Sequence, residues 1–315
     1  MINNYHYFIV LAEELNISRA AQKLFISHQC LSKYLKNLEK TYNTSFFERS
    51  PKLSLTPAGK LCLDTLLKIQ LLENNLNDQL RDIQTSKTGT IRFGTTEGRY
   101  RILIPDLLTD FNELYPHVKL DTYYNTSDQL LESLIKNELD IALMNEQYFN
   151  PSQFSVRPIL KEQLYMVISD DLLRKHFPFD FEACKETFRH GVDLSKCQDI
   201  PFILNHPGFR SRNVLDEYLA SCSLQLNCIL ELTQQDLHFM LAAKNFGACF
   251  CWAMYIPSIL EQNHCNTGRL NVFPIKGLRK TNQVVLVTPK DRIFPSYGRE
   301  LMHLVERNCR KSFPL

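Results

Sequence analysis

The sequence lacks the patterns that mark secreted and membrane proteins. Its first residues, MINNYHYF, show no basic segment followed by an apolar one, so we expect no secretory signal peptide. The apolar stretch FGACFCWAMYI is too short to cross a bilayer. The chain has 10 cysteines but no CxxC pair, which favours reduced thiols over a disulfide framework. Together these absences predict a cytoplasmic protein that does not use a membrane.

Catalytic and metal-binding motifs are also missing. There is no HExxH, no GxSxG and no Asp-rich metal loop, and Gly94 with Gly98 forms neither a dinucleotide nor a phosphate-loop fingerprint. Cys249 and Cys251 are spaced as small side chains of a buried strand would be, and a metal or redox role is the less favoured alternative. We therefore expect no enzymatic activity, no cofactor and no metal.

The small net charge conceals an uneven distribution. The 315 residues carry +2 overall, but residues 1–60 hold eight Lys or Arg against four Asp or Glu. Because this segment carries +4, the rest of the chain carries −2. The length suits two or three domains, and 44% hydrophobic residues is typical of folded cores. The basic excess therefore lies at the N-terminus of a multidomain protein.

Three helical patterns fill the first part of the chain. Apolar residues at helical spacing predict a helix over Tyr5–Glu14. Ser18 is the expected cap of a second helix, Arg19–Phe25. Ser27 is the expected cap of a third helix that runs to about Tyr42. This order of elements is typical of a helix-turn-helix.

The third helix has an apolar side and a polar, basic side. The run FFERSPKLSLTPAGK that follows it predicts the two short extended pieces of a wing, with Thr56 and Pro57 beginning a further helix. A polar, basic helix face fits the major groove of DNA. The alternative is a merely solvated face, but helix pattern, cap, wing and local charge all agree on DNA binding. The outward side chains are His28, Gln29, Ser32, Lys33, Lys36 and Asn37.

A long helix is predicted from Ala58 to Gln84. This segment has no proline and, after Gly59, no glycine. Its apolar residues recur at intervals of three and four, in a seam too regular and too isolated in sequence to be only a domain core. We therefore expect the helix to pair with the same helix of a second chain. The seam consists of Cys62, Leu66, Ile69, Leu72, Leu76, Leu80 and Ile83.

Beyond a polar break at 85–89, short apolar runs alternate with helical patterns, as in an α/β domain with parallel strands. We expect two lobes. The first has strands at 90–94, 119–124 and 140–144 and helices at about 99–115 and 126–137. Extended pieces within 157–168 lead to a second lobe with strands near 201–204, 226–231 and 247–252, and the chain returns near 270–275 to a strand at 283–287 and a last helix from 297.

The N-terminal run NISRAAQKLFISHQCLSKYLKNLEKTYNTSFFERSPKLSLTPAGK resembles the winged helix-turn-helix of LysR-type transcriptional regulators. The resemblance continues through FGTTEGRYRILIPDLLTDFNELYPHVKLDTYYNTSDQLLESLIKNELDIALM, which is similar to the effector domain of that family, a fold shared with periplasmic solute-binding proteins. The motif matches are Ser18, Ala20, Ala21, Leu24, Ser27, Leu31, Ser32, Lys33, Leu38, Glu39, Phe47, Arg49, Thr56 and Gly59.

The resemblance implies DNA contacts at the start of the third helix and in the wing. Two departures from the family pattern bear on base preference: the position of His28 is usually Gln and that of Gln29 often Pro, and the wing between Arg49 and Thr56 is shorter than usual. The predicted DNA-binding residues are Arg19, Ser27, His28, Gln29, Ser32, Lys33, Lys36, Arg49 and Lys52.

The effector site is expected where the strands of the two lobes end. In open α/β lobes, ligands lie beyond the carboxyl ends of strands, where helix N-termini offer free N–H groups. By resemblance, Thr96, Arg99 and Asn145 match family positions that contact effectors, and Arg99 favours an anion. The predicted effector-binding residues are Thr95, Thr96, Arg99, Asn125, Thr126, Asn145, Asn205, His206 and Phe250.

Two alternatives for these loops remain open. Thr96 and Thr126 could serve only as helix caps, with Arg99 pointing to solvent. A neutral or apolar effector would instead be held by Tyr123, Phe250 and the region around residue 204.

These features predict an α winged helix-turn-helix (1–58), a linker and dimerisation helix (59–88) and a two-lobed α/β effector domain, with lobe 1 formed by 89–165 and 272–315 and lobe 2 by 166–271. We expect a ligand-responsive regulator that binds a palindromic site in double-stranded DNA as a homodimer or homotetramer, with RNA polymerase as a further partner. The alternatives are a small-molecule-binding module of solute-binding type without a regulatory role, and an enzyme on the same fold.

Overall fold

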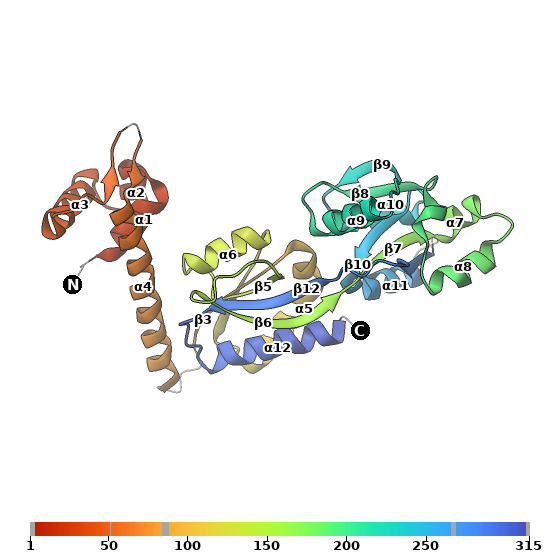
Figure 1. Ribbon diagram of the computed structural model, residues 1–315. Coiled ribbons are helices and arrows are strands. Elements are labelled where there is room, and N and C mark those ends of the chain that lie inside the picture. Colours follow the sequence, from red (N-terminus) through yellow and green to blue (C-terminus); the bar gives the residue numbers. More distant parts are fainter. Residues whose placement is uncertain (1–3, 51, 84–87, 266–268, 313–315) are drawn as a thin grey trace.

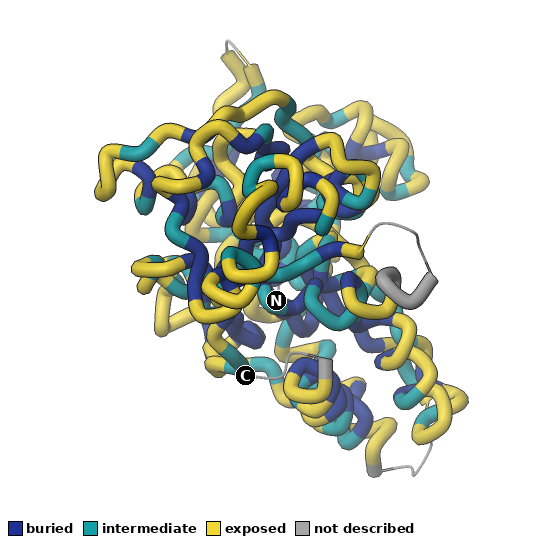
Figure 2. Tube along the Cα trace, turned by 90° about the vertical axis from the view of Figure 1, so that its right-hand side faces the viewer, coloured by how far each residue is buried: buried dark blue, intermediate teal, exposed yellow. Residues whose placement is uncertain are grey.

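The computed structural model of the protein describes residues 4–50, 52–83, 88–265 and 269–312. One long helix joins an N-terminal head to two α/β lobes (Figure 1). Buried residues run through the interior of each part, and exposed residues surround them (Figure 2). Most of the predicted break at 85–89, the last residue of the predicted long helix and Pro51 of the predicted wing lie outside the described residues.

The head contains the predicted three helices and wing. These elements are α1 (Tyr5–Glu14), α2 (Ile17–Lys23), α3 (His28–Tyr42) and the antiparallel strands β1 (Phe47–Glu48) and β2 (Ser54–Leu55). The small residues of α2 let the neighbouring helices approach closely, because they fill little space in the core. The head core is formed by Phe8, Ile9, Leu11, Ala20, Ala21, Leu31, Leu35, Leu38, Phe46, Phe47 and Leu66, among others.

The two capping predictions in the head had different outcomes. Ser27 caps α3 as predicted, and its hydroxyl accepts a hydrogen bond from the first turn at 3.1 Å. Ser18 does not cap α2, because the side chain of Asn16 accepts the backbone N–H of Arg19 at 3.0 Å. Asn and Ser are both good caps, and Asn16 has the extended backbone that a cap requires. The helix therefore begins at Ile17, before the predicted start.

The linker helix α4 (Pro57–Ile83) is capped by the hydroxyl of Thr56 at 2.9 Å, as predicted. The predicted seam has two parts. Leu66 is buried in the head core, whereas Leu72 and Leu76 are 61% and 55% exposed. The side chain of the last predicted member, residue 83, lies outside the described set. The exposed part, called here the exposed α4 face, consists of Ile69, Leu72, Leu76 and Leu80.

Lobe 1 is an α/β layer structure. Its strands are β3 (Gly89–Thr95), β4 (Val118–Tyr124), β5 (Ile141–Asn145), β6 (Phe154–Glu162) and β12 (Asn282–Pro289), in the order β4-β3-β5-β12-β6. β3 runs parallel to both neighbours, as predicted, and β12 is antiparallel to β5 and β6. Its helices are α5 (Glu97–Leu114), α6 (Ser127–Ile135) and α12 (Ser296–Ser312).

Lobe 2 has its own strands and helices. Antiparallel β10 (Cys249–Trp252), β7 (Leu164–Ser169) and β11 (Leu270–Pro274) pair in that order, and parallel β8 (Pro201–Asn205) and β9 (Asn227–Leu232) join them through a bridge between Phe202 and Ala248. The remaining elements are α7 (Asp170–His176), α8 (Phe181–Arg189), the 3-10 turn at Leu194–Cys197, α9 (Arg210–Ser221), α10 (Gln235–Ala243), the 3-10 turn at Ala253–Tyr255 and α11 (Ile256–Cys265).

Two crossing segments join the lobes. Residue 163 leads from β6 to β7, and residues 275–281 lead from β11 back to β12. β7 and β11 pair with each other in lobe 2 over the whole length of β11, from Leu270 opposite Ser169 to Pro274 opposite Tyr165. The crossings therefore differ from our predicted boundaries at 165/166 and 271/272, because an apolar run that continues over two strands does not show where the chain changes sheets. Glu162 and Asn282 form the last Cα pair of lobe 1 before the crossings.

Cys249 and Cys251 are buried in β10, as the strand pattern predicted. Burial raises the pKa of both thiols well above the usual value, which keeps them protonated and unreactive. Every described cysteine is a free thiol. Within the described ranges, no helix is both long and apolar enough to span a membrane, and no cluster of three or more His, Cys, Asp or Glu side chains is arranged to hold a metal ion.

Candidate DNA-binding and effector-binding sites

The first turns of α3 present the side chains that were predicted to read DNA. His28, Gln29 and Lys33 are exposed, and Ser32 is half-buried beside the head core. None of these four side chains forms a hydrogen bond or ion pair with another residue in the described part of the chain. Their donors and acceptors are therefore available to base edges and phosphates. Lys36 and Lys52 are exposed as well.

The remaining predicted DNA contacts already have partners within the head. The Arg19 guanidinium donates to the Glu14 carbonyl at 2.9 Å and lies 3.5 Å from its carboxylate. Arg49 at the end of β1 lies 3.7 Å from the Glu39 carboxylate. Exposed ion pairs of this kind contribute roughly 0–1 kcal/mol, so both arginines can exchange them for phosphate contacts. The hydroxyl of Ser27 is occupied by capping α3.

Two of the predicted effector loops meet at the ends of β3 and β4. The backbone N–H of Asn125 donates to the carbonyl of Thr95 at 3.1 Å. Thr126 and Gln129 form a capping box at the start of α6, so the capping alternative for Thr126 is confirmed. The Thr95 hydroxyl is buried and donates to the Leu143 carbonyl at 2.8 Å. The side chain of Thr95 is therefore part of the sheet rather than of an open ligand site.

Arg99 is the main correction to the predicted effector site. Its side chain is 2% exposed, and its guanidinium donates to Glu162 at 2.6 Å and to the Thr96 hydroxyl at 2.9 Å. The Glu162 carboxylate neutralises the charge that was expected to attract an anion. The alternative of an Arg99 side chain in solvent is also wrong, because the group is buried. Thr96 occupies the N-cap position of α5 but makes no side-chain bond to the helix backbone.

This ion pair belongs to a buried cluster at the crossing segments. The Asn282 side-chain amide donates to Glu162 at 3.1 Å and to Asn145 at 2.8 Å. The cluster therefore links the N-terminus of α5, the end of β5 and the last pair of the β6–β12 ladder. Sequence reasoning found Thr96, Arg99 and Asn145 but missed Glu162 and Asn282, because only the register of β6 against β12 brings them close.

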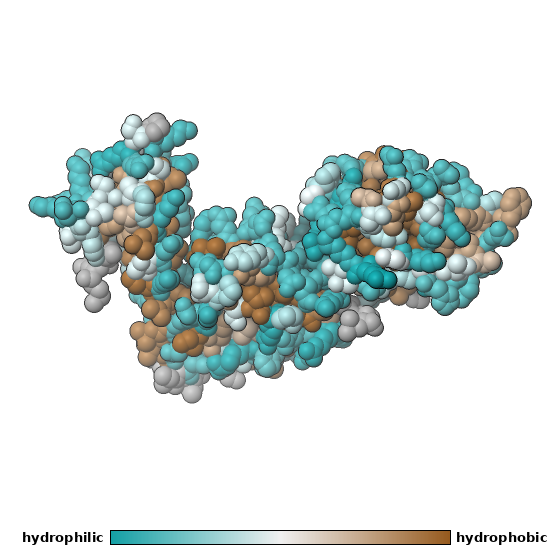
Figure 3. All heavy atoms as spheres, in the orientation of Figure 1, coloured by the Kyte–Doolittle hydropathy of each residue, from teal (hydrophilic) through white to brown (hydrophobic). Residues whose placement is uncertain are grey.

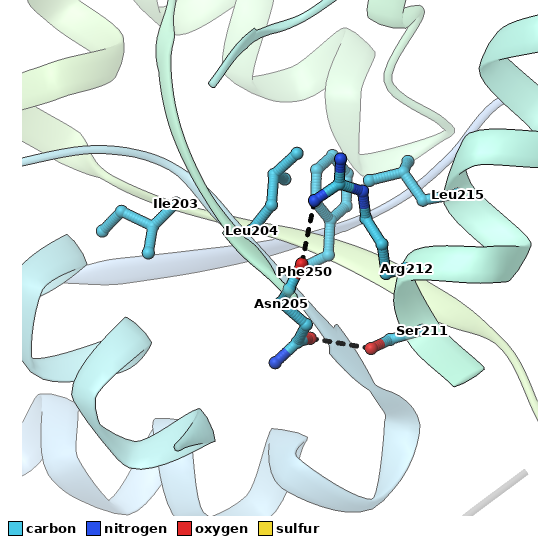
Figure 4. Close-up of a pocket in the computed structure, with 7 residues that line it drawn as sticks. All are labelled: Ile203, Leu204, Asn205, Ser211, Arg212, Leu215 and Phe250. Atoms are coloured by element: carbon cyan, nitrogen blue, oxygen red, sulfur yellow. Dashed lines mark hydrogen bonds between the residues drawn. The ribbon is translucent and has the colours of Figure 1, made fainter. Parts of the chain in front are cut away.

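In lobe 2 the predicted residues lie at the end of β8 and in the core. Asn205 is buried and accepts from the Ser211 hydroxyl at 2.7 Å (Figure 4). Phe250 stacks on Phe202 with ring centres 5.3 Å apart. His206 is exposed, 3.6 Å from the Glu231 carboxylate. The cavity beside Asn205 and Phe250 measures about 10 Å³, which is room for no more than one water molecule.

A larger groove of about 450 Å³ separates the lobes on the side of α5 and α10. Ile102, Phe239 and Tyr255 contribute apolar side chains to its lining, and Arg101 of lobe 1 forms an ion pair with Asp236 of lobe 2. Its volume lies within the range of small-molecule sites. None of these residues was predicted, because their relation depends on how two helices from different lobes face each other.

Polar contacts fasten the linker helix to lobe 1. Arg292, in the loop between β12 and α12, donates to Asp78 of α4 at 2.6 Å, to Asn75 of α4 at 2.9 Å and to Asp140 of lobe 1 at 3.2 Å. Asn75 in turn donates to the Asp291 carbonyl at 2.8 Å. All four of the polar side chains in this Arg292 network are nearly buried. α4 and lobe 1 are therefore held together by one shared network.

Solved structures of the same architecture include a variant of full-length OxyR from Pseudomonas aeruginosa, with a TM-score of 0.67 and 19% identity over 98% of this chain and 94% of that one. Full-length CbnR in complex with its target DNA has a TM-score of 0.55 and 17% identity, covering 98% and 99% of the two chains. These likenesses support the fold described above.

Sequence relatives carry regulatory names. The HTH-type transcriptional activator CmpR of Synechocystis is 25% identical over 237 residues, which are 75% of this chain and 73% of CmpR. The HTH-type transcriptional regulator CysL of Bacillus subtilis is 25% identical over 221 residues, 69% of each chain.

Two family models cover almost the whole sequence. Residues 2–60 match the bacterial regulatory helix-turn-helix of the lysR family, and residues 84–310 match the LysR substrate binding domain. Both matches coincide with parts of the fold, the first with the head and the second with the two lobes. The chain thus belongs to the LysR family of ligand-responsive, DNA-binding transcriptional regulators.

Proposed function

We propose that this regulator reads its DNA site with the first turns of α3 and holds the flanking phosphates with Arg19, Arg49 and the wing. The observation that carries this proposal is the set of side chains at the start of α3 that have no partner in the described part of the chain. Polar groups that face solvent without internal bonds are free to pair with bases. CbnR, which shares the architecture, has been solved with its target DNA.

Dimerisation through the exposed α4 face is the second part of the proposal. Four large aliphatic side chains follow one side of α4 below the head, and hydrophobic atoms gather there in the space-filling view (Figure 3). Leaving such a stripe in water costs about 25 cal/mol per Å². A second copy of the helix buries it and sets two heads side by side, as a palindromic DNA site requires. A homotetramer then forms as a dimer of such dimers.

The effector is a small molecule bound between the lobes. The interlobe groove supports this by its volume, which suits a small molecule, and by a lining that combines apolar with charged side chains. Because Glu162 already neutralises the charge of Arg99, a simple anion gains little electrostatic attraction there. A ligand that is neutral, or that carries both a positive and a negative charge, better fits the oppositely charged side chains of Arg101, Asp106 and Asp236 in the groove. Closure of the lobes on the ligand shifts the equilibrium between DNA-bound states.

The protein acts in the cytoplasm as a switch without enzymatic activity, and RNA polymerase is its partner in transcription. To test DNA reading, Gln29→Ala and Lys33→Ala are compared with the unchanged chain on a duplex selected from a random pool and on random DNA. Each base contact is worth roughly 1–3 kcal/mol, so binding to the selected duplex should weaken about 5- to 160-fold and random binding much less. Equal losses on both duplexes would reject base reading by α3.

A further inference from the structure

Phe25 is the most unusual residue of the head. Its side chain is 96% exposed, although Phe is normally buried. Its φ is +54°, in the left-handed region. It follows the C-cap residue of α2, Leu24, and the backbone bonds from Phe25 N–H to the Gln22 carbonyl (3.1 Å) and from Ile26 N–H to the Ala21 carbonyl (3.0 Å) close the helix. Gly or Asn normally occupies this position, because a Cβ is crowded there.

The rest of the chain follows that preference. Of the seven non-glycine residues described with positive φ, four are Asn and one is Ser. The other large one, Leu15, is 42% exposed, so more than half of its side chain is covered. Phe25 is neither a member of the head core nor one of the partly buried hydrophobic residues that pack against it. It therefore combines an unfavourable backbone conformation with an exposed ring, and no packing within the described chain compensates for either.

The position of Phe25 indicates what covers the ring. It lies two residues before Ser27, whose cap begins α3, and so precedes His28 and Gln29 by three and four residues. A helix-turn-helix places the N-terminal end of its recognition helix in the major groove. Lys23 at the end of α2 is exposed and pairs with Glu13 and Glu14 at 3.2 and 3.4 Å, and such exposed ion pairs can be exchanged for a phosphate contact.

We propose that the Phe25 ring packs against the apolar edge of DNA, a thymine methyl group or a deoxyribose, beside the bases read by α3. This inference rests on the proposed DNA reading by α3. Phe is one of the side chains that contact the thymine methyl in the major groove. The unfavourable conformation at residue 25 holds the ring away from the head core and toward the groove, so that no rearrangement is needed on binding.

The test uses Phe25→Asn in the full chain, on the duplex that the unchanged protein selects from a random pool. Asn fits the left-handed position, so the melting temperature should stay the same or rise by a few degrees. The affinity for DNA should nevertheless fall at least fivefold. Phe25→Trp, which keeps an aromatic ring, should retain most of the affinity. Phe179→Asn is the matched control, because Phe179 of lobe 2 is 97% exposed and far along the chain from α3; its DNA affinity should be unchanged.

Replacing thymine by deoxyuridine separates the two possible contacts. If the ring packs on a methyl group, the substitution weakens binding of the unchanged chain and has no further effect on Phe25→Asn. If it packs on deoxyribose, the substitution changes the affinity of both proteins equally or not at all, while Phe25→Asn still binds more weakly. Both results support contact with DNA.

Three results would overturn the inference. Unchanged affinity of Phe25→Asn would show that the ring does not contact DNA. A lower melting temperature together with lost binding would show a packing role. Normal DNA binding with reduced transcription by added RNA polymerase would assign the ring to a protein partner. Lys33→Ala is measured in parallel to separate this inference from the proposed function. If Lys33→Ala binds DNA normally, the proposed DNA reading by α3 is wrong. If Lys33→Ala loses affinity and Phe25→Asn does not, only the proposed role of Phe25 is wrong.

Discussion

Arg292 of lobe 1 donates to Asp78 of the linker helix at 2.6 Å, and both side chains are almost fully buried. The same guanidinium lies 3.2 Å from Asp140, so one cation satisfies carboxylates of two different parts of the chain. A buried charge that loses its partner costs several kcal/mol. The contact therefore keeps the direction of α4 fixed relative to lobe 1 in this conformation.

The Arg292 network predicts a large effect of a single substitution. Arg292→Met removes the cation that Asp78 and Asp140 share, although Asp140 keeps Arg92 at 2.9 Å and Asp78 keeps Arg81 at 3.7 Å. The free energy of unfolding should therefore fall by about 1.5–3 kcal/mol, the worth of the lost hydrogen bonds to charged groups. Urea denaturation measures this loss. Arg189→Met is the control, since Arg189 pairs with Glu186 in solvent and should change stability by less than about 1 kcal/mol. Equal small effects of both substitutions would show that the network does not hold α4.

The buried pair of Arg99 and Glu162 predicts non-additive effects. Arg99→Met and Glu162→Gln should each destabilise by about 3 kcal/mol or more, because each leaves a partner buried at 1–2% exposure. The double variant should lose less than the sum of the two. Urea denaturation of all four chains completes the cycle. Additive losses would mean that the two groups stabilise the fold independently of each other.

The exposed α4 face predicts the oligomeric state. Leu72→Asp and Leu76→Asp should give monomers in light scattering that bind half-sites poorly, because two charges would face each other across the dimer. Neither leucine contributes to the head core, so the melting temperature of the head should not fall. Lys68→Asp, exposed on the same helix, is the control for an added acid. An unchanged mass for the leucine variants would place the dimer contact elsewhere.

His238 predicts a pH dependence of stability. Its side chain is fully buried in lobe 2, and burial lowers the pKa of the imidazole below its usual value. The unfolded chain binds a proton near pH ~6.5, where the folded chain does not. The unfolded state thus holds more protons in acid, so stability is fully present above pH ~6.5 and decreases as the pH falls towards the folded pKa.

The loss should reach about 1.4 kcal/mol for each pH unit below that point until the folded ring titrates. The fluorescence of Trp252, the single tryptophan, reports unfolding of lobe 2 during urea titrations at several pH values. His238→Phe should flatten the dependence, and the exposed His117→Gln should preserve it. A slope that survives in His238→Phe would assign the effect to another group.

The sequence correctly predicted those elements that are determined by residues close to one another in the chain. Apolar spacing gave the head helices, the linker helix and most strands of both lobes, and the caps at Ser27 and Thr56 followed from hydroxyls before helical runs. The misplaced cap of α2 has a local cause too, because Asn16 and Ser18 are both suitable and only the backbone conformation decides between them.

The features that it missed depend on distant parts of the chain. Glu162 follows Arg99 by 63 positions, and Arg292 follows Asp78 by 214. Nothing near Arg99 in the sequence shows that its charge is neutralised, so the prediction of an anionic effector relied on an exposed cation. The groove between α5 and α10 likewise arises only when the lobes are assembled. Pairings of this kind require the register of β6 against β12 and the packing of the two lobes.

The last β6–β12 pair, Glu162 and Asn282, has a consequence for how such chains diversify. The whole of lobe 2 leaves and re-enters lobe 1 at two directly opposite residues, so it is an insertion whose ends are already adjacent. An inserted unit with adjacent ends can be replaced without changing the path of the chain in the domain that carries it. Recombination at these two positions would exchange the whole of lobe 2 in one step. The sensed molecule would then change, while lobe 1 would keep its attachment to the linker helix and the DNA-binding head.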